Sequence, residues 1–191
     1  MQDPLRFEGR ILFLSADPDR IRRQLEGEDL SLDDALPLRD QVSTDEITPA
    51  FICYHYDETL GEFPYLGLKC GEELPVGRGA VRAGGFAVSV SGRRRGKGSS
   101  REASPFAELC AGVRLVLAES FERIYRQNCQ NLGLLTSTDF GLVDRIRRGE
   151  PIPLAEFTRG LDPITAGIVA AGGLFPYSLA RQEGRVTCPA P

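Results

Sequence analysis

Tryptophan is absent from this sequence, histidine occurs once, at His55, and no apolar run approaches the roughly 20 residues that a membrane-spanning helix needs. A metal site built from several histidines requires more than one of them. The sequence therefore predicts no membrane-spanning helix and no multi-histidine metal site within this chain.

Cysteine is also scarce, and its pattern is unlike that of a disulfide framework. The five cysteines are odd in number and widely spaced, and no two of them form a Cys-x-x-Cys pair. This pattern argues against a disulfide-stabilised fold and against a zinc or iron–sulfur site made by this chain alone. We expect no metal on this chain and a reducing, cytoplasmic environment. The cysteines are Cys53, Cys70, Cys110, Cys129 and Cys188.

Charge and composition are those of an ordinary globular protein. The 191 residues include 41% hydrophobic and 26% charged residues, and the net charge is −4. A chain of this length can bury a sizeable core. The negative net charge argues against binding of nucleic acid or a membrane surface by the domain as a whole, although it leaves a local basic patch open.

Short apolar runs alternate with helical patterns, which predicts an α/β chain. We expect one domain over residues 1–191, with a strand, helix and loop in 1–39 preceding a core in 40–191. Residues 40–50 look irregular, and 51–56 fit a strand or a short helix equally well. Strands are expected at 9–14, 86–90 and 114–118, and helices from Asp17-Pro18, from Ser104-Pro105 to about 111, from Ser120 to 132, from Thr138-Asp139, and at 163–171, the last one.

Residues 96–102 read Gly-Lys-Gly-Ser-Ser-Arg-Glu and carry the clearest chemical signal. Glycine lets backbone amides approach a ligand closely, and the start of a helix just beyond favours an anion. Arg101 could clamp a carboxylate or phosphate through two parallel hydrogen bonds. Ser99, among such donors, could act as a base.

Three other interpretations of this stretch compete with an anion site. A nucleotide-binding phosphate loop does not fit, because Gly98 follows Lys97 where a serine or threonine is required. A nucleic-acid patch made by residues 93–95 and Lys97 lacks interleaved aromatic residues. A plain solvated glycine loop is the simplest alternative, and composition alone favours it.

Three motifs in this chain resemble signatures of one family, and they occur in that family's order. Residues 98–102 read Gly-Ser-Ser-Arg-Glu, and residues 40–50 read Asp-Gln-Val-Ser-Thr-Asp-Glu-Ile-Thr-Pro-Ala. Residues 120–135 contain Ser-Phe-Glu-Arg-Ile and, further on, Gly-Leu-Leu. Together they resemble the swivelling domain of the aconitase superfamily, also found as the small subunit of 3-isopropylmalate dehydratase. The fold implied is the swivelling β/β/α domain of the aconitase and isopropylmalate dehydratase small-subunit type.

The resemblance implies an isomerising hydro-lyase, which dehydrates and rehydrates a 2-hydroxy di- or tricarboxylate. In that family a large iron–sulfur dehydratase subunit or domain carries a [4Fe–4S] cluster, so no cofactor is expected on this chain. A 3-isopropylmalate dehydratase-like activity on a small hydroxy-dicarboxylate is our first expectation, and an aconitase-like domain is the alternative. A non-enzymatic module that binds anions or RNA is the competing class.

The same resemblance assigns roles to individual residues. Ser99 matches the family's serine base, Arg101 its substrate-clamping arginine and Asp45 its active-site aspartate. The expected substrate contacts are Ser100, Thr48, Gly98, Lys97 and His55. Turn capping by Asp45 and purely structural roles for Thr48 and His55 stay open.

The chain also departs from the family pattern. Lys97 stands where the family often has cysteine, and Ala103 where it usually has histidine. The segment of residues 15–39, between the first strand and the motif at 40–50, is longer than in the usual small subunit. The segment 51–58 lacks the arginine that a third substrate carboxylate would need, which favours an apolar or unusual substituent over citrate.

Overall fold

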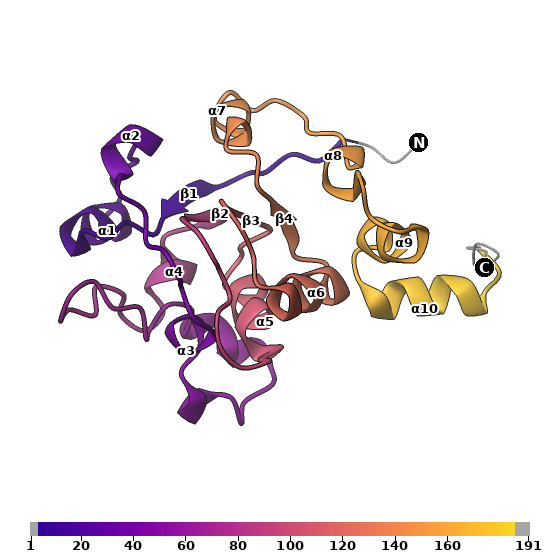
Figure 1. Ribbon diagram of the computed structural model, residues 1–191, viewed down its shortest axis with the longest axis horizontal. Helices are drawn as coiled ribbons and strands as arrows, with labels where there is room; N and C mark the ends of the chain where they lie inside the picture. Colours follow the sequence, from indigo (N-terminus) through magenta and orange to yellow (C-terminus); the bar gives the residue numbers. More distant parts are fainter. Residues whose placement is uncertain (1–3, 186–191) are drawn as a thin grey trace.

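Four parallel strands form a single sheet at the centre of the protein. The computed structural model describes residues 4–185. The strands are β1 (Arg10–Phe13), β2 (Phe86–Ser91), β3 (Leu115–Ala118) and β4 (Leu135–Ser137), and they lie side by side in the order of the sequence. Strands β2 and β3 are buried along their whole length, as inner strands of a sheet covered on both faces must be. The α/β class expected from the sequence is confirmed (Figure 1).

The connection from β1 to β2 is long and holds six short helices, whereas later connections hold one helix each. The six are α1 (Pro18–Leu25), α2 (Leu32–Ala35), α3 (Thr44–Ile47), the 3₁₀ helices η1 (Ala50–Ile52) and η2 (Glu58–Glu62), and α4 (Ala80–Ala83). Helix α5 (Ala103–Cys110) joins β2 to β3, and α6 (Arg123–Leu132) joins β3 to β4. After the sheet come α7 (Gly141–Arg147), α8 (Ala155–Thr158), α9 (Pro163–Ala171) and α10 (Leu174–Gln182).

Neighbouring residues of each strand serve opposite faces of the sheet, because side chains alternate along a strand. Leu12 packs in one core layer together with Tyr125 of α6. Phe13 packs in the other layer with Leu142 and Ile146 of α7. Helices α5 and α6 therefore cover one face and α7 the other, which is visible in Figure 1.

The first half of the chain follows the expected local signals closely. The side chain of Asp17 accepts a hydrogen bond from the Asp19 amide, and Pro18 is the first helical residue of α1. Residues 40–50, expected to be irregular, contain the short helix α3. Its capping box, in which Ser43 and Glu46 bond each other's backbone amides, is readable in the sequence as Ser-x-x-Glu.

Three helix predictions need correction. Helix α5 begins at Ala103, one residue before the expected start. Helix α6 begins at Arg123, and Ser120 does not cap it: the Ser120 hydroxyl accepts from the amide of Arg94 instead. The prediction that 163–171 is the last helix is wrong, because α10 follows at once. Gly172 ends α9 in the left-handed region at φ 82° and Gly173 at φ 128° starts α10.

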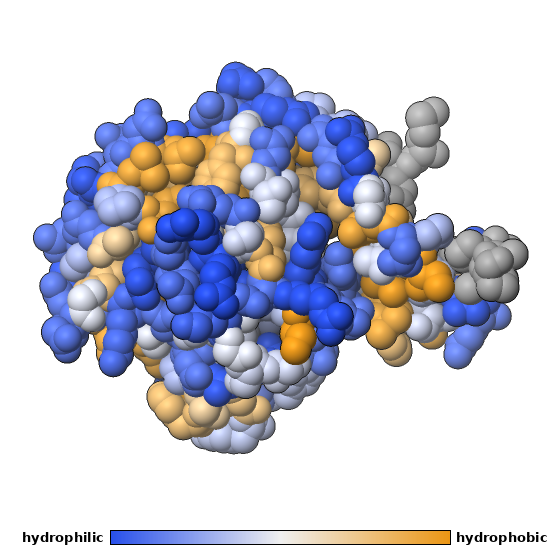
Figure 2. All heavy atoms as spheres, in the orientation of Figure 1, coloured by the Kyte–Doolittle hydropathy of each residue, from blue (hydrophilic) through white to orange (hydrophobic). Residues whose placement is uncertain are grey.

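Helices α9 and α10 carry exposed apolar side chains. Ile164, Leu174, Phe175 and Leu179 are all substantially exposed, and Figure 2 shows apolar side chains gathered over this pair of helices. No single helix within residues 4–185 has the length and apolar character to cross a membrane. Within this range only the pair α9 and α10, taken together, has that length and apolar character, and the two helices meet at a bend of 99°. Cys188 lies outside the described residues.

Candidate functional site

The glycine-rich stretch singled out from the sequence lies at the carboxyl end of β2, just before α5. In open parallel sheets, ligands bind beyond the carboxyl ends of the strands. We call residues 96–102 the serine loop. Gly96 and Gly98 lie in the left-handed region, at φ 84° and 111°. A side chain at Gly96 would place its Cβ 2.2 Å from the Cβ of Tyr125, so glycine is required there for two reasons.

The segment containing α3 lies against the serine loop and holds its backbone. The Thr44 amide donates to the carbonyl of Lys97 at 2.8 Å, and the Thr44 hydroxyl donates to the carbonyl of Ser99 at 3.1 Å. The hydroxyl of Ser104 in turn donates to the Thr44 carbonyl at 3.2 Å. Thr44 was missed from the sequence, although it sits in the motif of residues 40–50 beside the residues that were chosen.

Arg101 and Asp45, which are far apart in the sequence, form an ion pair at the mouth of this loop. Nη1 of Arg101 also donates to the carbonyl of Thr48 at 3.2 Å. The Arg101 side chain is 18% exposed and that of Asp45 is 62% exposed. The guanidinium is thus held through one nitrogen, and its other donors meet no acceptor within the described residues, which leaves them for an anion.

Other polar groups around this ion pair have no partner within the described residues. The Thr48 hydroxyl is buried and makes no hydrogen bond. Ser99 and Ser100 are exposed, and no hydrogen-bond acceptor in residues 4–185 meets their amides. A buried hydroxyl without a partner costs free energy, so a ligand with oxygen atoms would stabilise this arrangement.

The basic run of residues 93–97 does not form a free basic patch. Arg95 is fully buried against Glu108. Arg93 pairs with Asp40 at 2.9 Å and Arg94 with Glu122 at 2.9 Å, while Lys97 donates to the Gln41 side-chain oxygen at 3.0 Å. Arg95 is therefore withdrawn from the surface, and the charges of Arg93 and Arg94 are paired with surface carboxylates, which argues against an RNA-binding patch here.

An aromatic segment is tied to the far end of the serine loop. The Tyr56 hydroxyl donates to Glu102 at 2.8 Å, and the Tyr56 ring stacks on Phe106 at 4.7 Å. Burial, together with the hydrogen bond to Glu102, raises the pKa of Tyr56 to about 12. Phe51 and Tyr54, at 70% and 80% exposure, extend outward from this tether. Neither Tyr56 nor Glu102 was chosen from the sequence.

His55 is the one expected substrate contact that the structure leaves apart from the others. Its ring lies 4.2 Å from that of Tyr54 and 6.4 Å from that of Phe63. No hydrogen bond or ion pair within the described residues connects it to the serine loop. The substrate-binding role of His55 stays a prediction without a geometric argument.

The cysteines of the described chain do not form a ligand set. Within residues 4–185 no group of three or more His, Cys, Asp or Glu side chains could hold a metal ion. Cys129 and Cys70 are buried core residues, and burial raises the pKa of both thiols, which disfavours the thiolate that would bind a metal. An iron–sulfur cluster therefore does not fit these residues.

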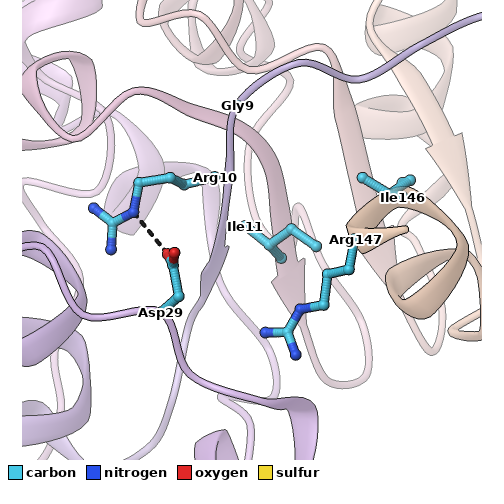
Figure 3. Close-up of a pocket in the computed structure, with 6 residues that line it drawn as sticks. All are labelled: Gly9, Arg10, Ile11, Asp29, Ile146 and Arg147. Atoms are coloured by element: carbon cyan, nitrogen blue, oxygen red, sulfur yellow. Dashed lines mark hydrogen bonds and ion pairs between the residues drawn. The ribbon is translucent and has the colours of Figure 1, made fainter. Parts of the chain in front are cut away.

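A second hollow lies at the opposite end of the sheet (Figure 3). It has a volume of about 410 Å³ and lies at the amino end of β1, where Arg10 pairs with Asp29 at 2.7 Å. The serine loop follows the carboxyl end of β2, and β1 and β2 are parallel. The two places are thus separated by the length of the sheet, and this hollow is not part of the candidate site.

Comparisons with known proteins show which proteins this chain is similar to. A family model described as the aconitase C-terminal domain matches residues 81–138, which include the serine loop. A 3-isopropylmalate dehydratase small subunit from Nitratidesulfovibrio vulgaris is 35% identical over 159 residues, covering 75% of this chain and 91% of that protein. An aconitase from Aspergillus rugulosus is 37% identical over 161 residues, which cover 78% of this chain but 17% of that protein. A crystal structure of 3-isopropylmalate dehydratase from Methanocaldococcus jannaschii matches with a TM-score of 0.56 and 30% identity, covering 76% of this chain and 91% of that one.

Proposed function

Because this chain belongs to the family of 3-isopropylmalate dehydratase small subunits, within the aconitase superfamily, we propose that it is the small subunit of an isomerising hydro-lyase that acts on a 2-hydroxy dicarboxylate. The observation that carries the proposal is the arrangement at the serine loop. Ser99 is exposed and lies two residues before Arg101, whose guanidinium is held through one nitrogen, and the buried hydroxyl of Thr48 has no partner within residues 4–185.

In this proposal Arg101 binds a substrate carboxylate. Its planar guanidinium can make two parallel hydrogen bonds to a carboxylate, and its bonds to Asp45 and Thr48 hold it in place before substrate arrives. Asp45 is the more exposed partner, so it forms the solvent side of this ion pair. Thr48, Ser100 and the amides around Gly98 supply further donors.

Ser99 is the proposed base. Its Oγ, as the alkoxide, takes the proton from the carbon next to a substrate carboxylate, and the electron pair forms a carbon–carbon double bond. The hydroxyl on the adjacent carbon leaves as hydroxide, which takes up a proton from solvent to become water, and Ser99 returns its proton to carbon when water is added back. Adding water back so that the hydroxyl and the hydrogen exchange carbon atoms isomerises the substrate. Serine is a weak base unless donors stabilise its alkoxide. In this proposal the donors are the amides of Ser99 and Ser100, which meet no acceptor within residues 4–185. A [4Fe–4S] cluster on a large partner subunit would supply the Lewis acid for the leaving hydroxyl.

Reconstitution with a large iron–sulfur subunit of the same family tests the proposal. We expect turnover of 3-isopropylmalate, followed through the absorbance of the conjugated alkene, and none by either chain alone. Turnover of citrate instead would favour an aconitase-like activity, for which the 37% identity to the Aspergillus aconitase speaks. Absence of turnover with either acid, together with RNA binding that weakens steeply with salt, would favour the non-enzymatic class.

The substitution Arg101→Lys is expected to lower kcat/KM, with a loss of roughly 2–4 kcal/mol in transition-state stabilisation. Lysine keeps the charge but cannot make the planar two-pronged contact. Steady-state kinetics of the reconstituted enzyme measures the effect. The matched control is Arg148→Lys, an exposed arginine paired with Glu150 on the far side of the sheet. A change below about twofold at Arg101 would show that it does not clamp the substrate.

The isolated chain is expected to bind no iron–sulfur cluster. The described cysteines do not group, and two of them are buried thiols with raised pKa values. Anaerobic reconstitution with iron and sulfide, followed by visible absorption and iron analysis, tests this. One cluster per chain in the absence of the large subunit would contradict it.

A further inference from the structure

A fully buried polar network lies directly beneath the serine loop. It consists of Arg95, Glu108, Tyr65, Tyr125 and Ser89, and none of its side chains reaches solvent appreciably. One Glu108 oxygen accepts hydrogen bonds from Arg95 and, at 2.6 Å, from the Tyr65 hydroxyl. The other accepts from the Tyr125 hydroxyl at 2.5 Å. Burial raises the pKa of both tyrosines, so both hydroxyls stay protonated donors.

The two charged members of this network stand on either side of the serine loop. Arg95 is the residue immediately before Gly96, and Glu108 lies on α5, the helix that begins immediately after Glu102. Their ion pair therefore ties the entry of the loop to the helix that follows its exit. The ring of Tyr125, which binds Glu108, is also the surface against which Gly96 packs.

The backbone of Arg95 reinforces this tie. The Arg95 amide donates to the carbonyl of Ser120 at 3.0 Å, and its carbonyl accepts from the Glu122 amide at 2.9 Å. The next amide, that of Gly96, donates to the carbonyl of Val42 at 2.8 Å. The start of the serine loop is therefore held by backbone hydrogen bonds to two segments, the one after β3 and the one before α3.

Stability alone does not account for this network. A buried ion pair roughly breaks even against apolar residues of the same volume, because both charges lose their hydration. Here Nη1 of Arg95 is buried and has no partner among residues 4–185, and Tyr65 adopts a left-handed backbone with φ 64°, which is strained for a bulky residue. Both features add cost. Hydrogen bonds between charged groups do provide a fixed direction, which apolar packing does not.

We propose that Arg95 and Glu108, with Tyr65 and Tyr125, are positioning residues for Ser99: their buried network holds the serine loop in the geometry in which Ser99 can accept a proton. The inference rests on the proposed function. Arg101 is anchored separately, by Asp45 and the Thr48 carbonyl, so loss of the network misplaces the base more than it weakens substrate binding.

The test uses the reconstituted enzyme with the double substitution Arg95→Met/Glu108→Met, which removes both charges and leaves none unpaired. We expect kcat to fall about tenfold or more while KM changes by less than about threefold. We also expect faster amide hydrogen exchange in residues 96–102, with unchanged exchange in β2 and β3. The control is Arg145→Met/Glu156→Met, which removes a two-pronged ion pair between α7 and α8 and should leave both readouts unchanged.

A folded double variant with kcat within about twofold of wild type and unchanged exchange in residues 96–102 overturns the proposal. If the double variant does not fold, Tyr125→Phe keeps the ring and removes one hydrogen bond to Glu108. It is expected to lower kcat about threefold and to speed exchange in the loop, and no change in either overturns the proposal. The exchange measurement needs no substrate, so it decides the positioning role even if the wild-type enzyme shows no turnover and the proposed function fails.

Discussion

Replacing Ser99 by alanine in the reconstituted enzyme is expected to lower kcat by about 10² to 10⁴, because the substitution removes the proposed proton acceptor. The same change is expected to alter the free energy of unfolding by less than about 0.5 kcal/mol. Ser99 is exposed, and its side chain makes no hydrogen bond within the described residues, so little folded-state interaction is lost. Steady-state kinetics and urea denaturation of the same preparations measure the two effects.

The control for Ser99→Ala is Ser178→Ala, an exposed serine on α10 whose hydroxyl donates to the Leu174 carbonyl. It should leave kcat unchanged. A Ser99→Ala enzyme with near-normal kcat and an intact fold would remove Ser99 from the proposed chemistry. A loss of kcat accompanied by unfolding would instead assign a structural role to this residue.

The single substitution Glu108→Met is expected to destabilise the protein by about 3–5 kcal/mol. It leaves the fully buried Arg95 without a counter-charge, removes the acceptor of the Tyr125 hydroxyl, and leaves the Tyr65 hydroxyl with Ser89 alone as acceptor. A buried cation without a partner cannot recover its lost hydration. The free energy of unfolding from urea denaturation, at a pH where all carboxylates are ionised, measures this cost.

Two comparisons sharpen this prediction. The substitution Glu156→Met breaks the partly exposed pair with Arg145 and should cost about 1 kcal/mol or less. Adding Arg95→Met to Glu108→Met should restore most of the lost stability, because no unpaired charge then remains buried. A Glu108→Met variant that is no less stable than Glu156→Met would show that the buried ion pair and its hydrogen bonds do not stabilise the protein.

The elements predicted best are those whose signals are local. The apolar run expected at residues 86–90 is the buried strand β2, and the Asp-Pro pair at 17–18 starts α1. The start of α6 was misplaced because the signal read from Ser120 is overridden by a tertiary contact. Its hydroxyl accepts from the amide of Arg94, which is 26 residues away in the sequence. Helix propensity is a weak signal, and such long-range contacts routinely override it.

The candidate site was likewise predicted where its signals are local and missed where they depend on long-range contacts. Ser99, Arg101, Asp45 and Thr48 were chosen from motifs, and the structure brings Arg101, Asp45 and Thr48 into direct contact beside Ser99. Thr44, which binds two carbonyls of the serine loop, was missed because a hydroxyl that bonds the backbone leaves no characteristic pattern in the sequence. Tyr56 was missed for a related reason, since its partner Glu102 lies 46 residues away.

The sequence by itself determined the α/β class, the positions of the first three strands and the family, because strands depend on local apolar patterns and the family on contiguous motifs. The short strand β4 was not among the expected strands. Only the tertiary structure decided what the basic run does. In the sequence Arg93, Arg94 and Arg95 are equivalent neighbours, and they suggest one charged surface. In the fold, the first two pair with carboxylates at the surface and Arg95 turns into the core against Glu108. Whether a charge faces water or a buried partner depends on how the chain crosses over the sheet, which no short stretch of sequence contains.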